Sequence, residues 1–205
     1  MKKIITILIL VFTVFCFGQP SNKFISKKYL LIGYNPTLQL KVIKRIKNST
    51  YYLISKNKKD TLIIDKDQTN WGIDTCVITQ KQLDNIGKPE LIIEHTKSKQ
   101  EFSEPHIGTS TTLQVWNIDT KTKLFSGVKN WHDESQEQSQ EEVDNNYKPK
   151  MVTNICAGGY DVEFLENGNL IVKNLFLKIE NNPYCKSDHF EGLYILKDGK
   201  YNLSK

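Results

Sequence analysis

The sequence predicts an all-β protein built from antiparallel sheets. Short runs rich in Val, Ile, Leu, Tyr and Thr recur along the chain, and each run ends in a cluster of Asn, Asp, Gly or Lys. No long segment carries apolar residues at helical spacing with both caps, so helix is expected to be a minor element. The absence of intervening helices argues against a parallel sheet. We expect about ten strands in a sandwich, an open barrel or a partial, propeller-like array.

The expected strands follow one another with short connections, as antiparallel hairpins do. The tetrapeptide 47–50 separates the first two, and 120–123 separates a later pair. Asn167-Gly168 and Asp198-Gly199 supply the positive φ angles that tight turns require. The expected strands are 38–46, 51–55, 61–65, 75–79, 91–96, 113–119, 124–128, 160–165, 170–179, 193–196 and 201–203.

Two polar segments interrupt this pattern and are predicted to be long loops. The first, 97–111, contains Pro105, His106 and Gly108, and the second, 129–150, is acidic and rich in Gln. Long loops in small domains are commonly either functional or disordered. We interpret the acidic segment as a solvated insertion, with a short frayed helix as one form, and a partner-binding loop is the alternative.

The N-terminus has the parts of a secretory signal. Lys2 and Lys3 precede the uncharged run 4–17, and Gly18 is followed by a polar stretch. As a helix the run would span about 21 Å, too short for the roughly 30 Å of a bilayer core. We therefore expect a signal peptide over 1–18, a single all-β domain over 19–205, and no membrane span. Lipid attachment at Cys16 is the rival interpretation, but Phe15 stands where lipoprotein signals have a small residue.

Three cysteines follow the expected signal. Cys156 and Cys185 bracket an apparent hairpin, so we predict a disulfide between them, while Cys76 lies in an apolar run and is expected in the core. Closing a loop of about 30 residues would stabilise the fold by roughly 3.5 kcal/mol. No Cys or His spacing typical of a structural zinc site occurs.

Charge is unevenly distributed along the expected mature chain. Residues 19–66 carry a net charge of +9 and residues 67–205 a net charge of −6. A basic segment can attract anionic lipid, glycan or nucleic acid. Only Arg45 is an arginine, however, and arginine is the residue best suited to gripping phosphate. We therefore expect no nucleic-acid partner and interpret the lysines as solvated side chains that protect strand edges.

The segment 82–93 resembles the calcium loop of integrin-type FG-GAP or VCBS repeats. Asp84, Gly87 and Glu90 match the repeat pattern, whereas Gln82 and Ile86 stand where acidic ligands belong. The resemblance implies a turn of the same shape, with calcium held by Asp84 and Glu90 as the one cofactor candidate. Generic antiparallel turn chemistry is the alternative interpretation.

A second stretch, 113–124, resembles the last hairpin of a β-propeller blade. Together the two resemblances cover about 25 residues, and neither motif recurs along the chain. A closed propeller needs at least four blades of four strands, which about ten strands cannot supply.

Candidate catalytic groups lack a recognisable motif. The histidines are His95, His106, His132 and His189, and Ser110 shares a segment with His106, but no nucleophile elbow or cysteine-protease signature surrounds any of them. We name no catalytic residue. Trp71 and Trp131 lie in polar neighbourhoods, so we expect them to be exposed ligand-contact aromatics.

These observations favour an exported, non-enzymatic binding or interaction module of the bacterial envelope or extracellular space. A minimal Lys-Lys signal, with 27 Lys to one Arg, indicates a bacterium with an AT-rich genome. The expected location is periplasmic or secreted, and the expected partner is a protein or glycan of the envelope. Two alternatives stay open: a small hydrolase that uses Asp, Glu or His of the two polar segments, and a structural envelope component.

Overall fold

The computed structural model describes residues 23–56, 61–66, 73–83, 87–101, 106–143, 146–183, 185 and 190–204. The predicted signal peptide, including Cys16, lies outside the described residues, as do Trp71 and Asp84. Within the described part, the chain forms thirteen strands and one short 3-10 helix, η1 (Ile46–Asn48). The predicted all-β class is therefore confirmed.

The strands form two antiparallel meanders. The first sheet has the order β1-β2-β3-β4-β5 and comprises β1 (Lys23–Ser26), β2 (Tyr29–Asn35), β3 (Leu40–Arg45), β4 (Thr50–Ser55) and β5 (Thr61–Lys66). The second sheet continues in sequence order and comprises β6 (Ile73–Lys81), β7 (Glu90–Glu101), β8 (His106–Asn117), β9 (Thr122–Val143), β10 (Asn146–Phe164), β11 (Leu170–Glu180), β12 (Gly192–Lys197) and β13 (Lys200–Leu203).

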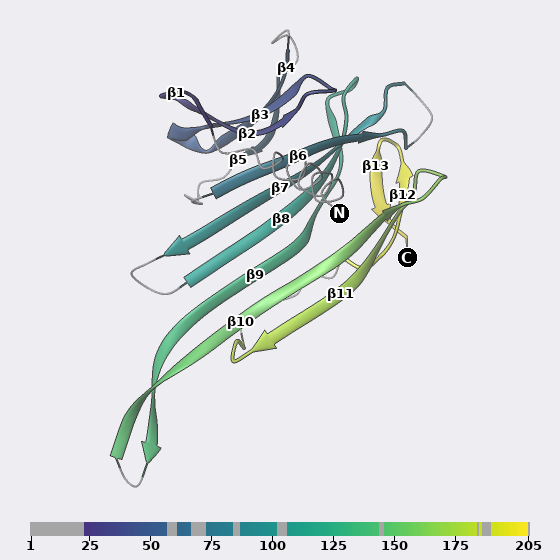
Figure 1. Ribbon diagram of the computed structural model, residues 1–205. Coiled ribbons are helices and arrows are strands. Elements are labelled where there is room, and N and C mark those ends of the chain that lie inside the picture. The colour runs from purple at the N-terminus through teal and green to yellow at the C-terminus, as the bar shows by residue number, and fades with distance from the viewer. Residues whose placement is uncertain are drawn as a thin grey trace, which may run out of the picture.

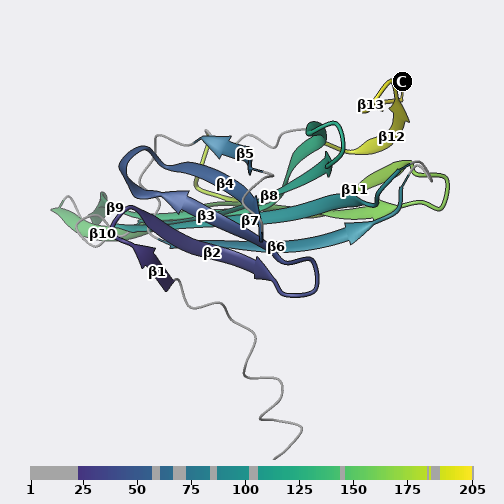
Figure 2. The same cartoon turned by 90° about the horizontal axis from the view of Figure 1, so that it is seen from above.

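The small sheet packs face to face on one end of the large sheet, over β6, β7 and β8, which gives a sandwich-like architecture (Figures 1 and 2). Gly33 on β2 permits a close approach of the two sheets, because a Cβ there would lie 2.5 Å from the carbonyl oxygen of Cys76 on β6. Asn35 also joins the sheets, donating from Nδ2 to the carbonyl oxygen of Ile78 at 2.7 Å.

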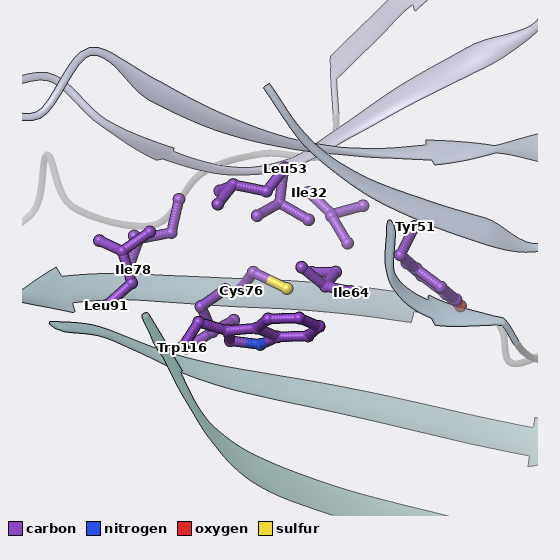
Figure 3. Close-up of a cluster of buried hydrophobic side chains, with 10 residues drawn as sticks. Ile32, Tyr51, Leu53, Ile64, Cys76, Ile78, Leu91 and Trp116 are labelled. Atoms are coloured by element: carbon purple, nitrogen blue, oxygen red, sulfur yellow. The ribbon is translucent and has the colours of Figure 1, made fainter. Parts of the chain in front are cut away.

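The first core fills the space between the two sheets (Figure 3). Side chains at alternate positions of each strand point inward, as the period of two requires. Cys76 is among them, buried and without a disulfide, as predicted. The buried members are Ile32, Val42, Tyr51, Leu53 and Ile64 from the small sheet and Cys76, Ile78, Leu91, Ile93 and Trp116 from the large sheet.

A second core lies on the other face of the large sheet. Ile92 points to this face while its neighbours Leu91 and Ile93 point to the first core, so β7 is buried on both faces. The C-terminal strands cover the second core, and β13 contacts β9. Its buried members are Leu83, Ile92, Leu113, Val115, Leu124, Phe125, Tyr160, Leu170, Val172 and Tyr194.

The prediction of two long loops is wrong, because the described parts of both segments are β-strand. Residues 97–101 and 106–111 extend β7 and β8, and 129–143 and 146–150 belong to a long β9–β10 hairpin. β8 pairs with β9 only as far as Ser135, and β11 pairs with β10 only to Ile155, so the outer hairpin projects as two strands (Figure 1). Its described outer positions, 136–138 and 150–151, are exposed. Exposed strand positions need no apolar alternation, which explains why this polar sequence was interpreted as a loop.

Candidate functional site

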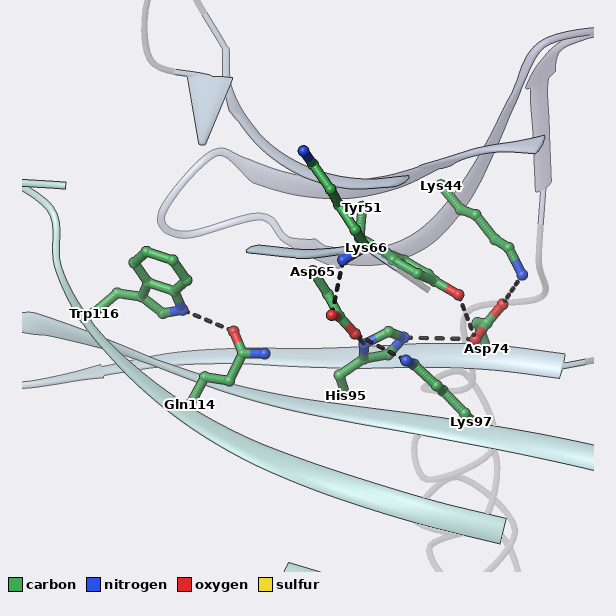
Figure 4. A network of polar contacts seen from close by, with 9 residues as sticks. All are labelled: Lys44, Tyr51, Asp65, Lys66, Asp74, His95, Lys97, Gln114 and Trp116. Atoms are coloured by element: carbon green, nitrogen blue, oxygen red, sulfur yellow. Dashed lines mark hydrogen bonds and ion pairs between the residues drawn. The ribbon is translucent and has the colours of Figure 1, made fainter. Parts of the chain in front are cut away.

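Six polar side chains gather between the two sheets beside the first core (Figure 4). We call this group the inter-sheet polar cluster; it comprises Lys44, Tyr51, Asp65, Asp74, His95 and Lys97. Lys44, Tyr51 and Asp65 come from β3, β4 and β5, and Asp74, His95 and Lys97 come from β6 and β7. The cluster thus joins five strands and both sheets.

Strand periodicity places these residues inside. Asp74 continues the inward row of Cys76 and Ile78 on β6, and His95 continues that of Leu91 and Ile93 on β7. Cys76 stands opposite His95, and Asp74 stands opposite Lys97, so the inward rows are adjacent. The polar residues therefore occupy positions where apolar side chains would otherwise extend the core.

Asp74 is the centre of the cluster. Its side chain is 1% exposed, and its Oδ2 accepts a hydrogen bond from Lys44 Nζ at 2.6 Å. Tyr51 Oη donates to Oδ1 at 3.2 Å. Lys44 Nζ also lies 5.5 Å from the centroid of the Tyr51 ring, and Lys97 Nζ lies 5.3 Å from it. A buried carboxylate is thus compensated by an ammonium and a phenol.

His95 lies fully buried between two carboxylates. Its Nε2 is 3.5 Å from Asp74 Oδ1 and its Nδ1 is 3.8 Å from Asp65 Oδ2, and neither ring nitrogen makes a hydrogen bond within the described structure. The imidazole packs edge-on against Tyr51, with centroids 4.5 Å apart. Asp65 has a closer partner in Lys97, at 2.8 Å.

The cluster alters two ionisation equilibria. Burial raises the pKa of Asp74, but the contacts with His95 and Lys44 outweigh burial, so the net pKa is lowered. Cys76 responds in the opposite direction: burial, together with the nearby carboxylates of Asp74 and Asp65, raises the pKa of its thiol well above the usual value. Cys76 is therefore an inert core thiol and no nucleophile.

We expect the cluster to lose its stabilising effect in acid. A carboxyl group whose pKa is lower in the folded state stabilises the fold above its ordinary pKa, near 3.8, and this contribution disappears as pH falls through that range. The free energy of unfolding, measured in urea from neutral pH to about pH 2, should fall less steeply with acid in Asp74→Asn than in the wild type. Parallel curves for the two proteins would contradict this expectation.

The cluster is a structural element more than a reaction centre. Its central groups Asp74 and His95 are almost completely shielded from solvent, and their partners are already engaged. General acid or base chemistry requires contact with a substrate proton. The geometry instead indicates a structural role, in which these polar contacts fix the position of the small sheet on the large sheet.

Two further His–acid pairs lie on the long strands. His106 Nε2 is 3.2 Å from Asp133 Oδ2, and His132 Nε2 is 3.2 Å from Glu134 Oε2. The hydrolase alternative relies on such pairs, and the first does join the two polar segments. However, neither pair lines the cleft at the turn end of the large sheet, whose lining residues include no histidine. We therefore derive no reaction from these pairs.

Of the two predicted calcium ligands, the structure describes only Glu90. Glu90 is fully buried, and its Oε2 accepts a hydrogen bond from the backbone N–H of Leu83 at 3.0 Å. Asp84, the other predicted ligand, is outside the described part. Across the residues that the structure places, no group of three or more Asp, Glu, His or Cys side chains is arranged to hold a metal ion.

The two motifs singled out from the sequence meet in space. Lys88, from the 82–93 motif, donates from Nζ to Asp119 Oδ1 at 2.6 Å and from its backbone N–H to Asp119 Oδ2 at 3.3 Å. Asp119 belongs to the 113–124 motif. The contact joins the β6–β7 and β8–β9 turns at one end of the large sheet.

The predicted role of Trp131 as an exposed aromatic is not supported. Its ring lies against Gly158, where a Cβ would collide with it, and it packs on Tyr160 with centroids 5.7 Å apart. Trp131 is therefore half-buried at the margin of the second core. A glycine opposite the tryptophan on the neighbouring strand was the sequence signal for this packing.

A cleft of about 470 Å³ opens at the same end of the large sheet. We call it the turn cleft, because three hairpin turns surround it: β8–β9, β10–β11 and β12–β13. Its lining residues are Asn117, Thr120, Thr122, Leu124, Asn167, Leu196, Asp198, Gly199 and Lys200. The sequence indicated these turns individually but not their convergence.

The predicted disulfide is present. Cys156 on β10 is bonded to Cys185 in the connection between β11 and β12, with Cα atoms 5.5 Å apart. Further along this connection, Phe190 packs on Tyr160, with ring centroids 6.1 Å apart. The described parts of the connection therefore lie over the face of β10.

The outer edge of β11 is the most apolar exposed element. β12 pairs with β11 only at Leu170–Val172, so among the described strands 173–180 have a neighbour on one side alone, namely β10. All eight of these residues are exposed. Leu175 is 65% exposed and Phe176 is 51% exposed, and Leu177 and Ile179 are also exposed.

Comparisons with protein-family models, with curated proteins and with solved structures return no match to the chain. Within the described residues, the structure contains no helix with the length and apolar character that a membrane crossing needs.

Proposed function

We propose that the chain is an exported, non-enzymatic interaction module that binds a polypeptide partner along the outer edge of β11. The observation that carries this proposal is the eight-residue edge 173–180. Here four large apolar side chains are exposed, and no described strand pairs with the outer side of the backbone. Soluble proteins normally protect such edges with charge, proline or a covering segment. An edge that is left apolar is typical of a surface that a partner covers.

Strand addition is the binding mode that fits this edge. A partner segment in extended conformation would pair with the backbone of β11, and its alternate side chains would contact the exposed apolar residues. A register shift between Gly159 and Tyr160 leaves Leu175 unpaired with β10, so regular pairing with a partner would run mainly over 176–180. The partner segment is expected to be largely apolar, since Lys178 and Glu180 give this stretch no net charge.

Export is part of the proposal and rests on two features. The N-terminal sequence has the pattern of a secretory signal, and disulfides such as Cys156–Cys185 persist mainly in oxidising compartments. An envelope or extracellular location would also bring the edge into contact with other exported polypeptides.

The test compares a charged edge with a charged control. Leu177→Lys places an ammonium on the edge, whereas Val77→Lys makes the same kind of change on β6, at a position that is 59% exposed against 44% for Leu177. Tagged wild-type and variant proteins would be incubated with envelope extract of the native organism, and captured complexes would be examined by amide hydrogen exchange.

We expect a discrete partner that the wild type and Val77→Lys retain and that Leu177→Lys loses. In the complex, amides of 176–180 should exchange more slowly than in the free protein. Equal capture by all three proteins, or protection confined to other strands, would refute binding at β11.

A further inference from the structure

We propose that the turn cleft is a binding site for a neutral carbohydrate. The proposal stands independently of binding at β11, because it rests on different residues and a different end of the large sheet. The cleft volume of about 470 Å³ falls within the range of roughly 300–1,000 Å³ that is typical of small-ligand sites.

The fold builds the walls of this cleft. In an antiparallel meander every second turn lies at the same end of the sheet, so the β8–β9, β10–β11 and β12–β13 turns share one end. The large sheet also curls, because β13 contacts β9 although three strands, β10, β11 and β12, lie between them in the sheet order. The curl brings Asp198 and Lys200 of the last turn around the same cleft as Thr120 and Thr122.

The lining has hydrogen-bonding capacity that the protein itself does not use. The Asp198 carboxylate and the Lys200 ammonium make no hydrogen bond or ion pair to any residue that the structure places. The amide groups of Asn117 and Asn167 use Oδ1 for local backbone contacts, which leaves Nδ2 of each available to a ligand. Sugar hydroxyls both donate and accept, so they can pair with carboxylate, ammonium, amide and hydroxyl groups together.

The balance of charge and apolar surface narrows the ligand class. One acid and one base line the cleft, so the lining carries no net charge and gives no reason for a charged ligand. Leu124 is buried and Leu196 is half-buried, and both contribute to the lining. They offer an apolar area against which the C–H face of a sugar ring can pack.

The walls are held in place before any ligand arrives. Asn117 Oδ1 accepts hydrogen bonds from the backbone N–H and the hydroxyl of Thr120, at 2.9 and 3.1 Å. Tyr201 Oη donates to the carbonyl oxygen of Gly168 at 2.6 Å, which ties the last hairpin to the β10–β11 turn. A site fixed in this way loses little conformational freedom on binding.

The experiment is a titration of isotope-labelled protein with maltose, cellobiose and N,N′-diacetylchitobiose at millimolar concentrations, followed by amide chemical shifts. Asp198→Gly removes the free carboxylate from a residue whose φ is 52°, a conformation that glycine adopts readily. Lys121→Gly is the matched control, since Lys121 also has a positive φ of 57° in an exposed turn but does not line the cleft.

We expect at least one sugar to shift the amides of Thr120, Asn167 and Gly199 together. Asp198→Gly should weaken the binding of that sugar by about tenfold or more, because it removes a hydrogen bond to a charged group. Lys121→Gly should bind the sugar as tightly as the wild type. Binding should persist at high salt, because the ligand is uncharged. The inference is overturned if no sugar shifts these amides, if Asp198→Gly binds as tightly as the wild type, or if salt abolishes binding.

Discussion

Asp74→Ala is expected to lower the free energy of unfolding by about 3–5 kcal/mol, because removing one partner of a buried ion pair leaves the other charge uncompensated. Lys44 is the stranded partner, with a side chain only 10% exposed and its Nζ 2.6 Å from Asp74 Oδ2. Tyr51 would also lose the hydrogen bond that its Oη donates to Asp74 Oδ1. Urea unfolding at neutral pH, followed by fluorescence, measures the loss.

Two further variants distinguish the effect of breaking a buried ion pair from the effect of losing any charged side chain. Glu163→Ala removes an exposed carboxylate that pairs with Lys173 at 3.2 Å, and it should cost about 1 kcal/mol or less. The double variant Lys44→Met/Asp74→Leu removes both buried charges, so it should be more stable than Asp74→Ala. If Asp74→Ala and Glu163→Ala lose similar amounts, the cluster contributes no more than a surface ion pair does.

The strands that sequence reasoning found were those with a buried face or a strong turn. The β10–β11 and β12–β13 hairpins were located by Asn167-Gly168 and Asp198-Gly199, whose glycines take positive φ angles of 81° and 70°. β1 and β2 were missed, although Ile32 of β2 is fully buried. Gly33, which the close packing on Cys76 requires, interrupts the apolar pattern of β2 and so weakens the local strand signal.

The inter-sheet polar cluster could have been predicted in part. Strand periodicity alone places Lys44 on the same face as Val42, and Asp74 on the same face as Cys76, so inward-pointing charges were readable from the sequence. Their pairing was not, because Lys44 and Asp74 belong to different sheets. Contact across a sandwich depends on how the sheets are stacked, and no spacing in the chain encodes that directly.

The turn cleft and the β11 edge also depend on contacts between distant segments, which the sequence does not reveal. Each turn has a local sequence signal, but the cleft exists only because the large sheet curls until its last hairpin faces the β8–β9 turn. Likewise, the apolar residues of 170–179 predicted a strand, but not that its outer edge is exposed. It is exposed because β12 pairs with only its first three residues.

Removal of the Cys156–Cys185 disulfide is the second large expected effect. The double variant Cys156→Ala/Cys185→Ala should lose about 3.5 kcal/mol, because the bond closes a loop across 29 positions of sequence and restricts the unfolded chain. Reductant should destabilise the wild type by a similar amount and leave the double variant unchanged. Chemical unfolding with and without reductant measures both values.

The location of the bond predicts where the folded state would loosen first. Cys185 holds the β11–β12 connection on β10, and Phe190 of the same connection packs on Tyr160 at the edge of the second core. Without the bond, amides of 190–194 should exchange faster, whereas those of β3 and β4 in the small sheet should change little.

Cys76→Ala is the control for loss of a thiol, because Cys76 is unbridged and lies in the other core. Uniformly faster exchange across both sheets would mean that the bond stabilises the whole molecule and not this connection. An insensitive wild type in reductant would instead show that the bond does not form in solution, which would remove one of the two supports for export.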